Sequence, residues 1–81
     1  MEKESELNRT LNETPLGCEA RVVAVNGNDG ITRRLLEMGV IPGVVLRVVK
    51  AAPFGDPIEV HLRGYSLAIR RSEASSIEVA A

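Results

Sequence analysis

The sequence predicts a small, mostly β domain: a closed or partly closed barrel of about five short strands with one short α-helix. Its apolar residues are almost all Val, Leu, Ile and Ala, and β-branched side chains pack well on pleated sheets. Short apolar runs are separated by clusters of turn-forming residues, which is typical of consecutive strands. The 81 residues suffice for one domain with one core. Closing a short-stranded sheet removes exposed edges, so a barrel is favoured.

The first residues are polar and charged. We expect residues 1–13 to be a flexible N-terminal segment and residues 14–81 to form the barrel domain. Leu7 and Leu11 are four residues apart and could share one face of a short helix, but a frayed terminus is the favoured interpretation. The segment has no apolar core, so it does not resemble a signal peptide.

One helix is expected over residues 31–38. It follows a first strand over residues 19–25, whose two faces are both mostly apolar and which we therefore expect to be buried on more than one side. Five loop formers, residues 26–30, separate the two elements. The apolar residues of the helix recur at spacings of four and three and form one stripe: Ile31, Leu35 and Met38.

Both ends of this helix carry stop signals. Asn28 or Asp29 can cap its start. Gly39 occupies the position where a left-handed residue ends a helix. Pro42 prevents a restart, and Pro42 with Gly43 suits the centre of a type II turn.

The second half of the chain is predicted to form mainly strands. Four further strands are predicted, over residues 44–49, 58–63, 66–71 and 77–79. We expect Gly64-Tyr65 to form a hairpin turn and residues 72–76 to form one helical turn before the last strand. The loop of residues 51–57 contains two prolines and should be stiff.

No arrangement of residues in the sequence suits catalysis or tight metal binding. Neither a phosphate-binding loop nor a nucleophile elbow occurs, so we expect no enzyme activity and no cofactor. The single histidine, His61, is expected to be an outward surface residue without metal-ligand partners at a suitable spacing. Cys18 is expected to be a small buried residue. Only weak surface binding of Fe2+ or Mn2+ stays open.

Charge and composition argue against several classes of protein. The net charge of −1 and the two aromatic residues are a poor basis for nucleic-acid binding, so no nucleic acid is expected. The doublets Arg33-Arg34 and Arg70-Arg71 could contact phosphate, although pairing with nearby Glu is favoured. A single cysteine excludes a disulfide-stapled secreted scaffold, and no apolar run approaches ~20 residues, so membrane insertion is not expected. A cytoplasmic location follows by elimination.

A binding surface is expected around residues 38–42 and 53–57. Phe54 is a large apolar residue at a loop tip, flanked by turn formers. Aromatic residues on stiff loops are good interface anchors. The alternative is that Phe54 folds back over the open end of the barrel.

Two strings carry a family resemblance. Arg-Leu-Leu-Glu-Met-Gly-Val-Ile-Pro-Gly, residues 34–43, followed by Ala-Pro-Phe-Gly-Asp-Pro, residues 52–57, resembles the FeoA family of ferrous iron transport proteins. The closing strand, Glu-Ala turn and final strand of that family have counterparts in residues 67–71, 73–74 and 77–79. The resemblance implies an SH3-like barrel with an inserted helix. Similar barrels end iron- and manganese-dependent repressors, but this chain has no helix-turn-helix and looks free-standing.

The resemblance also implies a partner. FeoA-like proteins are cytoplasmic, non-enzymatic accessories of FeoB, a membrane ferrous iron transporter with a GTPase domain. We expect an apolar surface and nearby charged residues to bind FeoB or its GTPase domain and to modulate transport. The expected partner-binding residues are Arg33, Arg34, Leu35, Met38, Val40, Pro53, Phe54 and Asp56.

Three rival interpretations stay open. An RNA- or ribosome-binding barrel would use the two arginine doublets. A divalent-metal-sensing regulatory domain would use His61 and nearby carboxylates. A GTPase-activating protein would insert Arg33 or Arg34 beside the nucleotide of FeoB, although no motif specifies such a finger. The oligomeric state also stays open, with a weak homo-oligomer among the alternatives.

Overall fold

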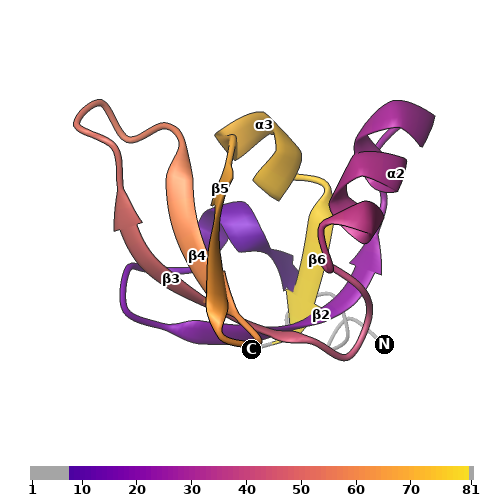
Figure 1. Ribbon diagram of the computed structural model, residues 1–81, viewed down its shortest axis with the longest axis horizontal. Helices are drawn as coiled ribbons and strands as arrows, with labels where there is room; N and C mark the ends of the chain where they lie inside the picture. The colour runs from indigo at the N-terminus through magenta and orange to yellow at the C-terminus, as the bar shows by residue number, and fades with distance from the viewer. Residues whose placement is uncertain (1–7, 81) are drawn as a thin grey trace.

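The structure is a computed structural model that describes residues 8–80 (Figure 1). Six strands, two short α-helices and one 3-10 helix follow one another along this part of the chain. In order they are β1 (Asn8–Thr10), η1 (Leu11–Glu13), β2 (Glu19–Val25), α2 (Asp29–Glu37), β3 (Val45–Ala51), β4 (Ile58–Leu62), β5 (Tyr65–Ile69), α3 (Arg71–Ala74) and β6 (Ile77–Ala80).

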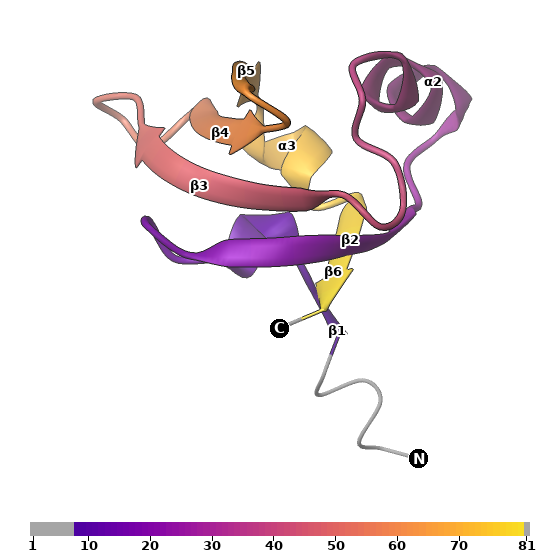
Figure 2. The same cartoon turned by 60° about the horizontal axis from the view of Figure 1, so that its bottom comes forward.

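The strands form one antiparallel sheet in the order β1-β6-β2-β3-β4-β5. The sheet curls so that β2 lies beneath the layer of β3, β4 and β5 (Figure 2). Its end strands, β1 and β5, are not paired with each other, so the barrel is only partly closed. The prediction of a mostly β fold with one inserted helix is confirmed, with one strand more than the five expected.

The extra strand lies in the segment expected to be flexible. β1 pairs with β6, with Arg9 opposite Val79, and the side chain of Leu11 in η1 is fully buried in the core. The free edge of β6 supplies backbone partners to β1, and burial of Leu11 holds η1 in place. Residues 8–13 therefore belong to the domain, which corrects the expected boundary at residue 14. Residues 1–7, including Leu7, lie outside the described residues.

The signals at both ends of α2 act as predicted. The side chain of Asn28 accepts a hydrogen bond from the N–H of Ile31 at 3.0 Å, so the helix begins at Asp29, two residues earlier than expected. At the other end Gly39 has φ +97° and donates to Leu36 O, while Val40 donates to Leu35 O, both at 3.0 Å. This pair of bonds is a Schellman motif.

The hairpin between β4 and β5 turns one residue earlier than expected. Arg63 and Gly64, with φ values of 47° and 87°, are the central residues, and Leu62 faces Tyr65 across the turn. Two successive positive φ values define a type I′ turn, whose twist matches that of the flanking strands. Tyr65 is therefore the first residue of β5 and not part of the turn.

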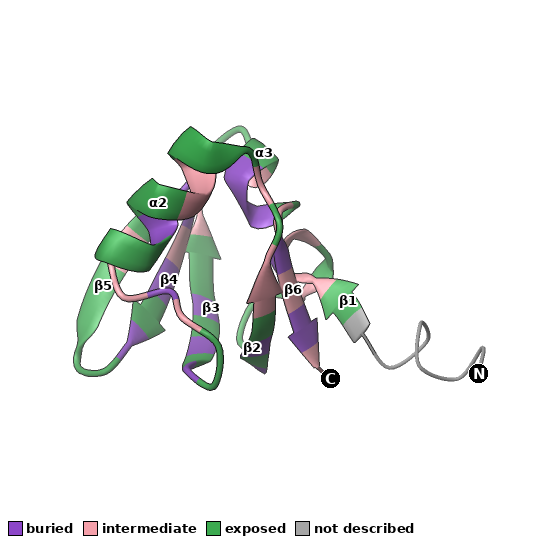
Figure 3. Ribbon diagram, turned by 90° about the vertical axis from the view of Figure 1, so that its right-hand side faces the viewer, coloured by how far each residue is buried: buried purple, intermediate pink, exposed green. Residues whose placement is uncertain are grey.

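The core lies between β2 and the layer of β3, β4 and β5, and under α2 (Figure 3). Inward-facing residues alternate with exposed ones along β2, β3 and β4. The buried apolar residues are Leu11, Ala20, Val22, Leu35, Val40, Val44, Leu46, Val48, Ile58, Val60, Leu62, Ile69, Ala74, Ile77 and Val79. Both aromatic side chains are absent from this set, so the core is entirely aliphatic.

Candidate partner-binding site

The loop between β3 and β4 is closed by its own backbone. Gly55 donates to Ala52 O at 2.7 Å, and Ala52 donates to Pro57 O at 2.9 Å. Pro53 sets φ in the first half of this turn, and Gly55 has φ +89°, which suits glycine. The predicted stiffness of the loop thus has a backbone basis in addition to its prolines.

Arg71 is hydrogen-bonded to the loop between β3 and β4. Its Nε donates to Gly55 O at 2.7 Å, and its backbone N–H donates to Asp56 Oδ1 at 3.0 Å. Its Nη1 donates to the backbone carbonyl of Asn12 at 3.3 Å and to Asn12 Oδ1 at 3.1 Å. One side chain therefore joins the loop, the start of α3 and η1. Asp56, which we expected to contact a partner, has at least one oxygen engaged within the protein.

Phe54 projects from this fixed loop into solvent. Phe54 is 99% exposed, and Pro53 beside it is also exposed. The alternative that Phe54 folds back over the barrel does not occur in the structure. A fully exposed aromatic ring on a restrained loop has the geometry of an interface anchor, because little conformational entropy is lost when it binds.

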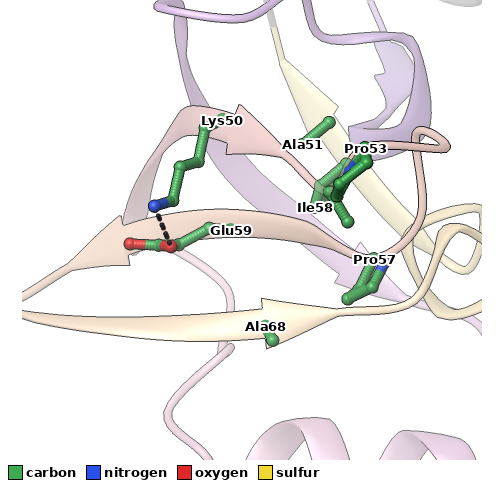
Figure 4. Close-up of a pocket in the computed structure, with 8 residues that line it drawn as sticks. Lys50, Ala51, Pro53, Pro57, Ile58, Glu59 and Ala68 are labelled. Carbon is green, nitrogen blue, oxygen red and sulfur yellow. Dashed lines mark ion pairs between the residues drawn. The ribbon is translucent and has the colours of Figure 1, made fainter.

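A shallow groove of about 260 Å³ lies beside the loop (Figure 4). Its lining comes from the ends of β3, β4 and β5 and from the two prolines: Lys50, Ala51, Ala52, Pro53, Pro57, Ile58, Glu59 and Ala68. Lys50 Nζ and Glu59 Oε1 form an ion pair at 3.6 Å on one side of it. The rest of the lining is aliphatic, so the groove can accept an apolar side chain.

The structure does not bring the predicted apolar surface together. Leu35 and Val40 are fully buried in the core, so they cannot touch a partner in this structure. Met38 is half-buried and packs against that core. α2 and the loop of residues 52–57 lie toward opposite ends of the molecule (Figure 1). This corrects the expectation of one continuous surface from α2 to Phe54.

The two arginines of α2 differ in their surroundings. Both are exposed, but Arg34 forms an ion pair with the buried carboxylate of Glu73 in α3, whereas Arg33 forms none with any residue that the structure describes. The second doublet is divided in the same way, since Arg70 is exposed and Arg71 is bonded to the loop. Two of the four arginines on which the RNA interpretation relies therefore have partners within the protein.

The other candidate residues lie apart from each other. His61 is exposed on β4, with Nδ1 3.4 Å from Ser66 Oγ. Cys18 is exposed, which corrects its expected burial; it lies between the turn at Leu16 and Gly17 and the start of β2. Within residues 8–80, no three His, Cys, Asp or Glu side chains are grouped to hold a metal ion. None of the helices in that range is long and apolar enough to cross a membrane.

A comparison with known families identifies the chain. Residues 9–81 match the model of the FeoA domain. The chain belongs to the FeoA family. The family takes part in ferrous iron transport, and the prediction of that family is confirmed.

Similar proteins support the family and the fold. The FeoA-like protein of Clostridium acetobutylicum is 36% identical, with a TM-score of 0.83 over 89% of this chain and 84% of that one. FeoA of Stenotrophomonas maltophilia, solved in complex with zinc and described as an SH3 domain protein, is 39% identical, with a TM-score of 0.76 over 86% of this chain and 87% of that one. The predicted SH3-like fold is thus confirmed.

A FeoA domain also occurs joined to a transporter. The Fe(2+) transport protein A/Fe(2+) transporter FeoB fusion protein of Porphyromonas gingivalis is 38% identical over 69 residues. That match covers 85% of this chain and 8% of the fusion protein, so the chain corresponds to a small part of that relative.

Proposed function

We propose that this FeoA protein is a cytoplasmic accessory of ferrous iron uptake that binds a FeoB transporter and modulates it through the loop of residues 52–57. The observation that carries the proposal is the exposed ring of Phe54 on a loop held by Arg71. Phe54 is the most exposed of the large apolar residues that the structure describes. The fusion relative supports FeoB as the partner, because it carries both proteins in one chain.

The proposed contact has three parts. Phe54 inserts into an apolar pocket of the transporter. Pro53 limits the flexibility of the loop. Asp56 fixes the position of the loop by accepting a hydrogen bond from the N–H of Arg71. Arg33 in α2 and Met38 at the C-terminal end of α2 lie far from this loop, and they would take part only if the partner extends across the molecule. Leu35 and Val40 have no role in contact.

The test is a binding measurement with full-length FeoB in native-like membranes. We expect Phe54→Ala to weaken binding by roughly 30-fold, the effect of losing an interface hot spot of ~2 kcal/mol. Leu16→Ala is the matched control, since Leu16 is a 57% exposed apolar residue on a different loop, and it should leave affinity unchanged. Full binding and full iron uptake by a folded Phe54→Ala protein would contradict the proposal.

A further inference from the structure

β5 is an edge strand that lacks the usual protection. It is the last strand of the sheet, and in residues 8–80 its backbone is bonded only to β4. Its five residues, Tyr-Ser-Leu-Ala-Ile, include no charge, no proline and no glycine, and its pairing with β4 has no bulge. Natural sheets use charges, prolines and bulges on their edge strands to prevent pairing with another chain. The opposite edge, β1, is only three residues long and carries Arg9 at its centre.

The hairpin geometry identifies which backbone groups are free. In a two-residue hairpin the residues that flank the turn, here Leu62 and Tyr65, exchange hydrogen bonds. Bonded and non-bonded pairs then alternate along the ladder, so Leu67 is bonded to Val60. The N–H and C=O groups of Ser66 and Ala68 therefore point away from β4, toward the free edge. Both residues are exposed.

The groove beside the loop lies at one end of this edge. Ala68 lines the groove and faces Glu59 across β4 and β5 (Figure 4). A strand added beside β5 would place the side chain opposite Ala68 on the same face of the sheet, and so over the aliphatic groove. Its neighbours in sequence would lie on the face of Leu67.

Charge identifies the kind of strand that fits. Arg63 directly precedes the turn residue Gly64, and Arg70 directly follows β5, so the edge is flanked by a cation at each end. Both arginines are exposed, and neither forms an ion pair with any residue that the structure describes. Suppose that a second molecule paired its own β5 antiparallel to this edge, with Leu67 opposite Leu67. Arg63 of each molecule would then lie close to Arg70 of the other. The charges therefore disfavour self-pairing and favour a strand with acidic ends.

We propose that the free edge of β5 binds an extended segment of a protein partner, apolar in the middle and acidic at both ends, as a seventh strand of the sheet. The backbone groups of Ser66 and Ala68 bind the segment, and the groove accepts one apolar side chain. Arg63 and Arg70 contact its acidic ends. The inference rests on the proposed function in one respect, which is that the segment belongs to the same transporter as the pocket for Phe54.

The experiment uses a blocked heptapeptide with aspartate at both ends and alternating valine and threonine between them. Amide hydrogen exchange is followed by NMR in the free and the peptide-bound protein. We expect the amides of Ser66 and Ala68 to exchange rapidly in the free protein and to become protected by the peptide, while that of Leu67 is protected in both. The same peptide with lysine ends should bind about fivefold more weakly, the effect of two exposed ion pairs.

A charge exchange supplies the matched variant. Aspartate suits both positions, since it tolerates the positive φ of residue 63 and is a good helix cap at residue 70. The double variant Arg63→Asp, Arg70→Asp should therefore fold and should prefer the lysine-ended peptide. Equal binding of both peptides by the wild-type protein would overturn the proposal. Protection of Ser66 and Ala68 that increases with protein concentration alone would also overturn it, in favour of a second copy.

The outcomes separate this inference from the proposed function. The peptide assay contains no FeoB and should be insensitive to Phe54→Ala. If FeoB binding is lost in Phe54→Ala but unchanged in the charge-exchanged variant, the edge inference fails while the proposed function stands. If the peptide protects Ser66 and Ala68 but Phe54→Ala leaves FeoB binding intact, the edge is a binding site and the proposed role of Phe54 fails.

Discussion

The phenol hydroxyl of Tyr65 donates a hydrogen bond of 2.6 Å to the carbonyl oxygen of Met38. Met38 caps the C-terminal end of α2, where backbone carbonyls lack partners within the helix. Tyr65 is the first residue of β5, so the bond joins the end of the helix to the edge of the sheet. Gly39 lies directly against the same hydroxyl, and a Cβ at that position would collide with it. The contact therefore requires glycine at position 39 for space as well as for its φ of +97°.

The first prediction separates these two requirements of Gly39. Gly43 has the same φ of +97°, but a Cβ there would meet no atom within 4 Å. We expect Gly43→Ala to lower the free energy of unfolding by about 1–2 kcal/mol, the cost of a left-handed conformation. Gly39→Ala should cost at least ~1 kcal/mol more, because it also displaces Tyr65. Urea denaturation measures both values.

A double-mutant cycle gives the control for this prediction. Tyr65→Phe should cost about 1 kcal/mol through the lost hydrogen bond. In that background Gly39→Ala should cost about as much as Gly43→Ala, because the colliding oxygen is gone. Equal costs of the two glycine substitutions in the wild-type background would show that the collision is relieved by a small movement of Tyr65.

The second prediction concerns the buried carboxylate of Glu73. Its oxygens accept from Arg34 and, at 3.0 Å, from the backbone N–H of Arg70. Arg34→Ala removes the counter-charge, so we expect a loss of about 1–3 kcal/mol in the free energy of unfolding. Arg33→Ala is the matched control on the same helix and should change stability by no more than about 0.5 kcal/mol. Thermal and urea unfolding of both variants check the difference, and equal stabilities would show that solvent replaces Arg34 without cost.

The third prediction tests whether Arg71 holds the loop that carries Phe54. Arg71→Ala removes the side-chain bonds to Gly55 and Asn12 and should destabilise the protein by about 1–3 kcal/mol. NMR order parameters of residues 53–56 should fall from about 0.85 toward 0.6, the range of flexible backbone. Arg70→Ala, one residue earlier and exposed, is the control and should leave them unchanged. Unchanged order parameters in Arg71→Ala would mean that the loop is held by its own backbone bonds.

Local signals were enough to predict most of the fold. The cap at Asn28, the left-handed Gly39 and the alternation along β4 each act within a few residues, so the sequence displays them directly. β1 has no such signal. It is three polar residues long, and it is a strand because β6, far along the chain, offers it an edge. The hairpin turn lies one residue before its predicted position for a related reason. The twist of the two paired strands favours a type I′ turn, which has Arg63 and Gly64 at its centre.

The candidate site was predictable only in part. Pro53, Gly55 and Pro57 predicted a stiff loop around Phe54, and the structure closes that loop with two backbone hydrogen bonds. The spacing of Leu35 identified the inward face of the helix but not the depth of its burial, which depends on the strands beneath it. The position of Arg71 could not be inferred, because Asn12 and Gly55 meet it only in three dimensions. Its sequence signal was an arginine doublet, which is equally typical of a solvated surface.

The last prediction tests the revised boundary of the domain. Leu11 is fully buried in the core, whereas Leu16, five residues later, is exposed. If residues 8–13 are part of the folded unit, Leu11→Ala should lower the free energy of unfolding by about 2–5 kcal/mol through lost burial and the cavity it leaves. Leu16→Ala, the same chemical change, should stay within about 0.5 kcal/mol. If the two variants were equally stable in urea denaturation, η1 would not contribute to the core, and the boundary expected at residue 14 would be restored.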